Sequence, residues 1–162
     1  MSRLSSNYAG RSMTRSLDLF AFTNLPPNRN TPFEMMMPRD GGRVVAGIEK
    51  AVQRWLKLLL TIRGTVFGDP SAGTEFIPSV MINGGGNEEI EATFNAAAKD
   101  IDTYLRARYE SDDTPLDEQI ESAELMPGWE ISNGRMRLSV RIITAAGVSA
   151  QIMVPVNSSF QH

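Results

Sequence analysis

Carboxylates are the residues in this chain best suited to catalytic chemistry. The 162-residue sequence holds 19 aspartates and glutamates. Hydrolysis of a glycosidic bond needs one carboxylic acid in an apolar cleft and a second carboxylate across the bond. Glu75, between Thr74 and Phe76, is the only carboxylate with apolar and glycine neighbours. We expect most acidic residues to solvate the surface and predict no catalytic site, with a small hydrolase that uses Glu75 as the alternative.

Side chains for nucleophilic or metal chemistry are scarce. The sequence contains no cysteine, which excludes disulfides and thiolate sites. Its one histidine is His162, so a histidine-based triad or zinc cluster is not expected. The acidic segment 110–118 lacks the alternating acids and central glycine of a calcium-binding EF-hand. The glycine-rich segment 83–87 lacks the Lys-Ser/Thr pair of a phosphate-binding loop. We therefore predict neither a metal site nor a cofactor.

The charge distribution gives no clear sign of nucleic-acid or membrane binding. The formal net charge is −3. Arg135, Arg137 and Arg141 alternate along one segment and could contact phosphate together with Arg106 and Arg108. The same alternation is typical of the polar face of an amphipathic sheet, where nearby acids offset the field. No segment approaches the roughly 20 apolar residues of a membrane span, and the N-terminal segment lacks the apolar core of a signal peptide. We expect a soluble protein with neither nucleic acid nor membrane as partner.

Residues 1–43 differ in composition from the rest of the chain. They are rich in Ser, Asn, Arg and Pro, a composition that seldom builds its own core. One apolar patch interrupts them, with Leu17, Leu19, Phe20 and Phe22. We predict an extended N-terminal arm that attaches to the domain through this patch.

Two segments show helical periodicity. In residues 44–62 the apolar side chains step by three and four from Val45 to Ile62, and Lys50 is among the charged residues on the opposite side. We predict a helix here that stops at Gly64. A second helix is predicted over 87–108, with glutamates in its first turn, where the helix dipole favours anions. The segment between them, 65–76, is broken by glycine and proline, and residues 75–82 are expected to form short extended or helical contacts.

From residue 119 onward the period becomes two. A first strand over 119–131 leads into Asn133-Gly134, a strong hairpin signal. Residues 136–142 and 148–154 alternate in the same way, and residues 145–147 turn the chain between them. The fold class we predict is α+β, with two amphipathic helices packed on a three-stranded antiparallel sheet. The domain spans 44–156 and a polar tail follows at 157–162.

A three-stranded sheet has two edges whose unpaired N–H and C=O groups can accept a strand from another chain. Together with an apolar arm, such edges are well suited to assembly. The segment Ile48–Phe76 also resembles the phage baseplate wedge family that includes baseplate assembly protein W, the sheath initiators of contractile tails. The resemblance lies in a helix that runs into a Leu-Leu-Thr-x-x-Gly turn at 59–64, followed by Asp69-Pro70 and by Gly73 to Phe76.

The order of elements extends this resemblance over 44–156, because the family also has a second helix and a C-terminal antiparallel sheet. Its Glu-Pro-Arg tripeptide is replaced by the residues of 116–120, so the contacts of that tripeptide are not carried over. The resemblance implies a structural protein of the virion tail baseplate, made in the host cytoplasm and present as repeated copies in a ring. Its implied partners are the tail sheath protein, baseplate wedge proteins and tail tube or hub proteins. Some members carry a lysozyme label, which makes a peptidoglycan-cleaving baseplate enzyme the alternative.

The expected partner contacts fall into four groups. The first is the segment after the first helix, the second the arginines of the sheet, the third the last strand, and the fourth the apolar patch of the arm. The candidate residues in that order are Arg63, Asp69, Thr74 and Phe76; Arg137 and Arg141; Val148, Ala150, Ile152 and Val154; Leu17, Phe20 and Phe22.

Overall fold

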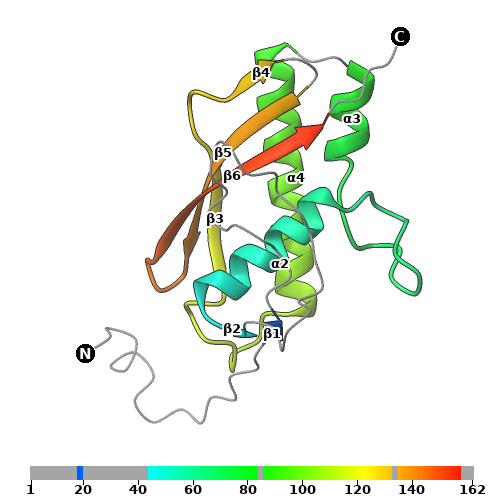
Figure 1. Cartoon of the computed structure of the whole chain (residues 1–162). Coiled ribbons are helices and arrows are strands. Elements are labelled where there is room, and N and C mark those ends of the chain that lie inside the picture. Colours follow the sequence, from blue (N-terminus) through cyan, green and yellow to red (C-terminus); the bar gives the residue numbers. More distant parts are fainter. Residues whose placement is uncertain (1–17, 20–43, 84–85, 133–134, 158–162) are drawn as a thin grey trace.

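A computed structural model describes residues 18–19, 44–83, 86–132 and 135–157 (Figure 1). Its elements follow in the order β1 (Asp18–Leu19), β2 (Val44–Val45), α2 (Ile48–Leu60), α3 (Phe76–Asn83), α4 (Asn87–Arg108), β3 (Ile120–Leu125), β4 (Glu130–Ser132), β5 (Arg135–Thr144) and β6 (Ser149–Asn157). The helices pack against the antiparallel sheet, so the predicted α+β class is confirmed.

Helix α2 is shorter at both ends than the predicted 44–62. It begins after Gly47, because Val44 and Val45 pair as strand β2 with β1. It ends at Leu60 rather than near Gly64, because Thr61 is extended and its carbonyl accepts a hydrogen bond from Thr74 N–H, 2.9 Å away. Both boundaries are therefore set by partners distant in the sequence.

The other helices follow local rules. Helix α4 has the predicted bounds, and its apolar stripe from Ile90 to Leu105 is buried at intervals of three and four residues. Helix α3 occupies a segment for which the sequence left extended and helical contacts open. Pro78 lies in its first turn, where the missing N–H costs no intrahelical hydrogen bond.

The sheet is three strands wide. β5 pairs with β6 along one side, from Arg135 to Ile143, and with β4 and then β3 along the other. The predicted first strand is thus split into β3 and β4, with Pro127 and Gly128 in the interruption. Ser132 pairs with Arg135, which is the register that the Asn133-Gly134 signal predicted.

Strand β3 corrects the predicted alternation. A strict period of two from residue 119 would place Ile120, Ser122 and Glu124 on one face. The pairing with β5 shifts between Ile120 and Ser122, so Ile120 and then Ala123 and Leu125 pack on the core. An extra residue on one strand flips the faces beyond it, which is what a β-bulge does.

The core lies between the helices and the inner face of the sheet. Three aromatic rings meet there: Trp55 and Phe94 have centroids 5.9 Å apart, and Phe76 meets Phe94 edge-on at 6.2 Å. Alternate residues of β5, from Met136 to Ile142, pack against them as predicted. The three helices and the sheet therefore share one continuous core.

Only two residues of the predicted arm belong to the described part of the chain. Asp18 and Leu19 form β1, which pairs antiparallel with Val44 and Val45. The arm contacts predicted for Leu17, Phe20 and Phe22 lie outside the described residues.

Candidate functional site

The segment between α2 and α3 is an ordered loop, which we call the 61–74 loop. Its two ends lie side by side, because Ile62 forms a parallel bridge with Thr74. Arg63 N–H donates to the Thr74 carbonyl at 3.1 Å, and the buried Thr74 hydroxyl donates to the Leu59 carbonyl at 3.2 Å. Closed ends and a compact course are the features of an Ω-loop, a class of loop that is frequently functional.

Three consecutive tight turns build the loop. Backbone hydrogen bonds of 3.2 Å close Ile62–Thr65, Val66–Asp69 and Asp69–Ala72. In the middle turn Gly68 occupies the third position with a φ of 83°, the positive value that a type II turn needs there. Phe67 precedes it at the tip. The backbone of the tip is therefore held in place by its own turns.

Side chains tie the loop to α4. The Tyr104 hydroxyl donates to the Asp69 carboxylate at 2.6 Å, and the Ser71 hydroxyl donates to the other carboxylate oxygen at 2.6 Å. These hydrogen bonds, Ser71 foremost, hold the pKa of Asp69 below its usual 3.8, and the bond to Asp69 raises the pKa of Tyr104 well above its usual range. Arg63 and Asp100 add an ion pair of 2.7 Å. The loop is therefore fixed to the helix at both flanks.

The loop carries an apolar tip that the sequence analysis missed. Phe67 is fully exposed, and Ile62 and Val66 are each about two-fifths exposed. Among the described residues, seven large apolar side chains are exposed, and three of them lie in this loop. The sequence does carry a signal for this tip, because Val66 and Phe67 directly precede Gly68-Asp69, a typical turn pair. Apolar side chains within a surface turn seldom reach the core.

The structure places the predicted contacts of this segment in two environments. The side chains of Arg63 and Asp69 reach the surface but are engaged by α4. The side chains of Thr74 and Phe76 are fully buried, because Thr74 closes the loop and Phe76 packs on Phe94. Thr74 and Phe76 were predicted to contact a partner, but their buried side chains instead stabilise the loop and the core.

Strand β6 forms one edge of the sheet. Thr144 N–H donates to the Val148 carbonyl, so in the register with β5 the residues Ala150, Ile152 and Val154 direct their backbone groups toward β5. Ile152 and Val154 are buried and Ala150 is half-buried, so their side chains serve the core rather than a partner. Val148, in the turn before β6, is 38% exposed.

The alternate residues of β6 direct their backbone groups outward. Ser149, Gln151 and Met153 have this parity, and within the described ranges no strand pairs with them on that side. The backbone of Pro155 is also directed away from β5. Its missing N–H therefore removes no hydrogen bond between β5 and β6. The outward edge thus offers backbone donors and acceptors from Ser149 to Met153.

Arg137 and Arg141 lie on the outer face of β5, where the sequence placed them. Arg141 is exposed and stands opposite Glu124 of β3 in the register, and Arg137 is half-buried. A carboxylate beside an arginine lowers the local positive field.

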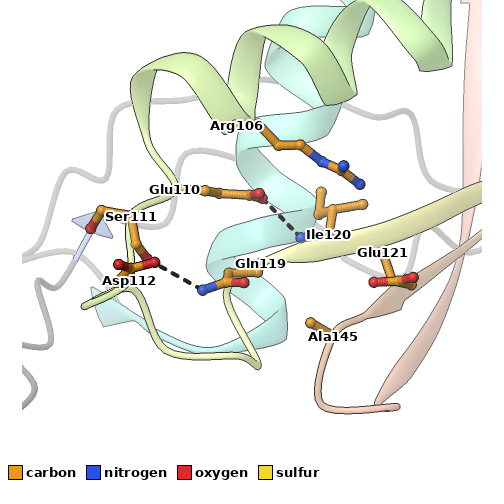
Figure 2. A pocket seen from close by; sticks show the side chains of 8 residues that line it. All are labelled: Arg106, Glu110, Ser111, Asp112, Gln119, Ile120, Glu121 and Ala145. Carbon is orange, nitrogen blue, oxygen red and sulfur yellow. Dashed lines mark hydrogen bonds between the residues drawn. The ribbon is translucent and has the colours of Figure 1, made fainter. Parts of the chain in front are cut away.

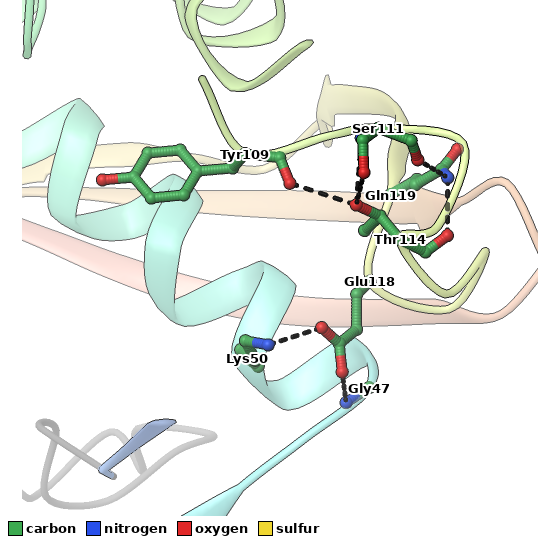
Figure 3. Close-up of polar contacts among 7 residues, drawn as sticks. All are labelled: Gly47, Lys50, Tyr109, Ser111, Thr114, Glu118 and Gln119. Carbon is green, nitrogen blue, oxygen red and sulfur yellow. Dashed lines mark hydrogen bonds and ion pairs between the residues drawn. The ribbon is translucent and has the colours of Figure 1, made fainter. Parts of the chain in front are cut away.

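A buried ion pair was not predicted. Lys50 was placed on the side of the first helix opposite its apolar stripe, and Glu118 lies in the acidic segment 110–118, whose side chains were expected to solvate the surface. Their side chains are 1% and 2% exposed, and Lys50 Nζ lies 2.6 Å from Glu118 Oε2 (Figure 3). The second carboxylate oxygen, Oε1, accepts Gly47 N–H at 3.2 Å. Asp117 is also buried. This pair joins the start of α2 to the segment that leads into β3.

The segment before Glu118 is held by its own polar contacts. The Gln119 amide donates to the Thr114 carbonyl at 2.8 Å, and the Thr114 hydroxyl donates to the Tyr109 carbonyl at 3.2 Å (Figure 3). Ser111 N–H donates to the Thr114 hydroxyl at 3.0 Å. The loop therefore presents Glu118 from a defined backbone.

An open cavity of about 430 Å³ lies between the end of α4 and the start of β3. Glu110 points across it and accepts Ile120 N–H at 3.0 Å (Figure 2). Burial raises the pKa of the Glu110 carboxyl, and the hydrogen bond from Ile120 opposes this. The other lining side chains are Arg106, Ser111, Asp112, Gln119, Glu121 and Ala145. The cavity is polar and suits small hydrophilic groups.

The setting proposed for a catalytic carboxylate is not observed. Glu75 is exposed and lies just before α3, rather than in an apolar cleft. Within the described residues, no group of three His, Asp or Glu side chains is arranged to hold a metal ion. In the same part of the chain, no helix is long and apolar enough to cross a bilayer.

Two surfaces are best suited to bind a partner. They are the exposed apolar tip of the 61–74 loop and the outward edge of β6. Comparison of the chain with protein-family models, with curated proteins and with solved structures returned no match.

Proposed function

We propose that this chain is a structural component of a contractile tail baseplate. In this role it joins wedge and tube to the first sheath ring by strand pairing and so initiates sheath assembly. It acts in repeated copies arranged in a ring, and its partners are the sheath protein, wedge proteins and tube or hub proteins. The observation that carries the proposal is the outward edge of β6, together with the order of elements that resembles the sheath-initiator family.

The edge of β6 suits an incoming strand better than the opposite edge does. β6 runs without interruption over nine residues. The opposite edge is divided between β3 and β4 and carries a bulge at its start. Bulges and interruptions protect an edge against further pairing. An added strand is therefore expected at β6, along Ser149 to Met153.

A backbone joint fits the mechanical task. Main-chain hydrogen bonds give a strand joint its strength, while side-chain identity along the joint is loosely constrained. Since Ile152 and Val154 anchor β6 in the core, load on the joint is passed to the whole domain. The joint can remain connected while the joined domains rotate during contraction.

A single substitution tests the joint. Gln151→Pro removes one outward N–H and leaves the hydrogen bonds to β5 in place, because Gln151 directs its backbone away from β5. Gln151→Ala is the matched control: it also loses the side-chain hydrogen bond to Ser139, but it keeps the N–H. The full chain is mixed with purified sheath protein of the same phage, and assembled sheath is counted by electron microscopy.

We expect wild type and Gln151→Ala to nucleate sheath and Gln151→Pro to fail while it remains folded by circular dichroism. Normal sheath from Gln151→Pro would overturn strand pairing at this edge. No sheath with any variant, wild type included, would overturn the role in sheath initiation.

A further inference from the structure

We propose that the 61–74 loop is a second docking element, which inserts Phe67 into a neutral apolar pocket on a wedge protein. The inference rests on the baseplate role proposed above, because the partner belongs to that assembly. The sheath joint at β6 uses backbone groups, whereas this contact uses a side chain.

The apolar side chains at the tip of the loop are exposed to solvent. Phe67 has a relative exposure of 104%, and Val66 beside it is 39% exposed. A phenylalanine side chain gains free energy when it leaves water, so a fully exposed one at a loop tip forgoes that gain in the isolated chain. Aromatic anchors that fill a pocket are typical of protein interfaces.

The tip is also preorganised. The turn Val66–Asp69 is closed by its own hydrogen bond, and the Asp69 carboxylate is held by Tyr104 and Ser71. Little backbone freedom remains to be lost on docking. Reducing that loss is how a rigid loop gains affinity over a flexible one.

The tip of the loop carries no charge of its own. Arg63 and Asp69 are the charged residues of the loop, and each already has partners within the chain: Asp100 for Arg63, and Tyr104 with Arg108 for Asp69. The residues at the tip, from Thr65 to Gly68, are uncharged. A pocket that receives the tip therefore needs no compensating charge, which indicates a neutral apolar lining.

A second copy that offered its cavity at Glu110, or a membrane, fits these features less well. The open cavity at Glu110 is lined by carboxylates and Arg106, which is unsuitable for a phenylalanine ring. Membrane-surface binding needs a broad apolar face supported by basic residues, whereas this loop exposes three apolar side chains with one arginine and one aspartate nearby. The chemistry favours a pocket on a different protein.

The position of the loop allows both contacts at once. The loop follows the end of α2, and the turn between β5 and β6 lies on the opposite side of the molecule (Figure 1). The edge from Ser149 to Met153 begins at that turn, so a sheath strand on β6 and a wedge protein on Phe67 would use separate parts of the surface.

The test uses the full chain and each purified wedge protein encoded with it, with affinity measured by isothermal titration calorimetry. We expect Phe67→Ala to weaken one of these complexes by about 10- to 100-fold, the loss typical of removing a buried aromatic anchor. The matched control is Ile82→Ala, since Ile82 is an apolar residue, 81% exposed, on α3. We expect it to change affinity less than twofold.

The occupant is identified by Phe67→p-benzoylphenylalanine, which cross-links its neighbour on illumination. Cross-linking to the wedge protein supports the inference. Cross-links to a second copy, or within the isolated chain, assign the tip to another occupant and overturn it. Equal affinities for wild type and Phe67→Ala overturn it while the baseplate role stands. If wild type binds no wedge protein, the inference falls, and the sheath assay above decides the proposed function separately.

Discussion

Replacing Glu118 by glutamine is expected to destabilise the protein more than any comparable change to a surface carboxylate. The substitution preserves the size of the side chain and an oxygen that can accept Gly47 N–H. It removes the negative charge 2.6 Å from the Lys50 ammonium, and both side chains are at most 2% exposed. A buried ammonium that loses its carboxylate keeps its desolvation cost without the Coulombic attraction that offset it.

The expected size follows from this burial. Removing one member of a buried ion pair costs about 3–5 kcal/mol, and the retained acceptor for Gly47 places Glu118→Gln near 3 kcal/mol. That is a large share of the roughly 5–15 kcal/mol by which a domain is stable. With a urea m-value of about 2–3 kcal/mol/M, the midpoint of unfolding should fall by roughly 1 to 1.5 M.

The assay is urea unfolding followed by far-UV circular dichroism. Glu121→Gln is the matched control, because Glu121 is an exposed carboxylate three residues away, and it should stay within about 0.5 kcal/mol of wild type. The double variant Lys50→Met with Glu118→Gln should recover much of the loss, since it removes both charges and keeps an acceptor for Gly47 N–H. Equal midpoints for Glu118→Gln and Glu121→Gln would refute the reasoning.

Two further predictions concern backbone geometry and pH. Gly73→Ala should lower the free energy of unfolding by more than about 2 kcal/mol, because φ of Gly73 is +92° and a Cβ there would lie 2.4 Å from the Thr61 carbonyl oxygen. Gly64→Ala should cost about 1 kcal/mol, because φ of Gly64 is +83° but a Cβ there would meet no neighbouring atom. Equal shifts of the melting temperature for the two variants would contradict this. Burial raises the folded pKa of Glu110 above its usual 4.5, so the folded state retains the proton longer and wild-type stability should fall relative to Glu110→Gln as pH rises from 4.5 through the raised value. Unfolding curves that keep a constant difference across this window would contradict it.

Local patterns in the sequence predicted the parts of the fold that local forces determine. The stripe of α4, its glutamates in the first turn and the Asn133-Gly134 hairpin signal all depend on residues within a few positions of one another. The alternation along β5 likewise predicted which side chains are buried, because one face of a half-covered sheet must be apolar.

The errors occur where distant segments decide the outcome. Lys50 is charged and follows the polar side of its helix, so periodicity alone places it in water, whereas its ion pair with Glu118, 68 residues away, helps to make its burial tolerable. The start of α2 is likewise set by the pairing of Val44 and Val45 with β1. Such contacts leave no periodic trace in the sequence.

The candidate site was predicted in part for the same reason. The segment after α2 was singled out through its resemblance to a known motif, but the wrong aromatic residue within it was expected to contact a partner. Phe76 was expected at a partner and lies in the core, whereas Phe67 was not singled out and is fully exposed. Phe67 stands between Val66 and Gly68 in the closed turn at 66–69, whereas Phe76 begins α3 and packs on Phe94.

The two proposed surfaces imply a division of tasks. Pairing at β6 depends on backbone groups that every strand possesses, so it provides strength with little discrimination between partners. Docking at Phe67 depends on one side chain and the shape of its pocket, so it discriminates between partners through a small area. A connector that must seat at one place and then carry load needs both properties. Loss of Phe67 should therefore misplace the chain within the assembly, whereas loss of the outward N–H of Gln151 should leave it in place without a sheath.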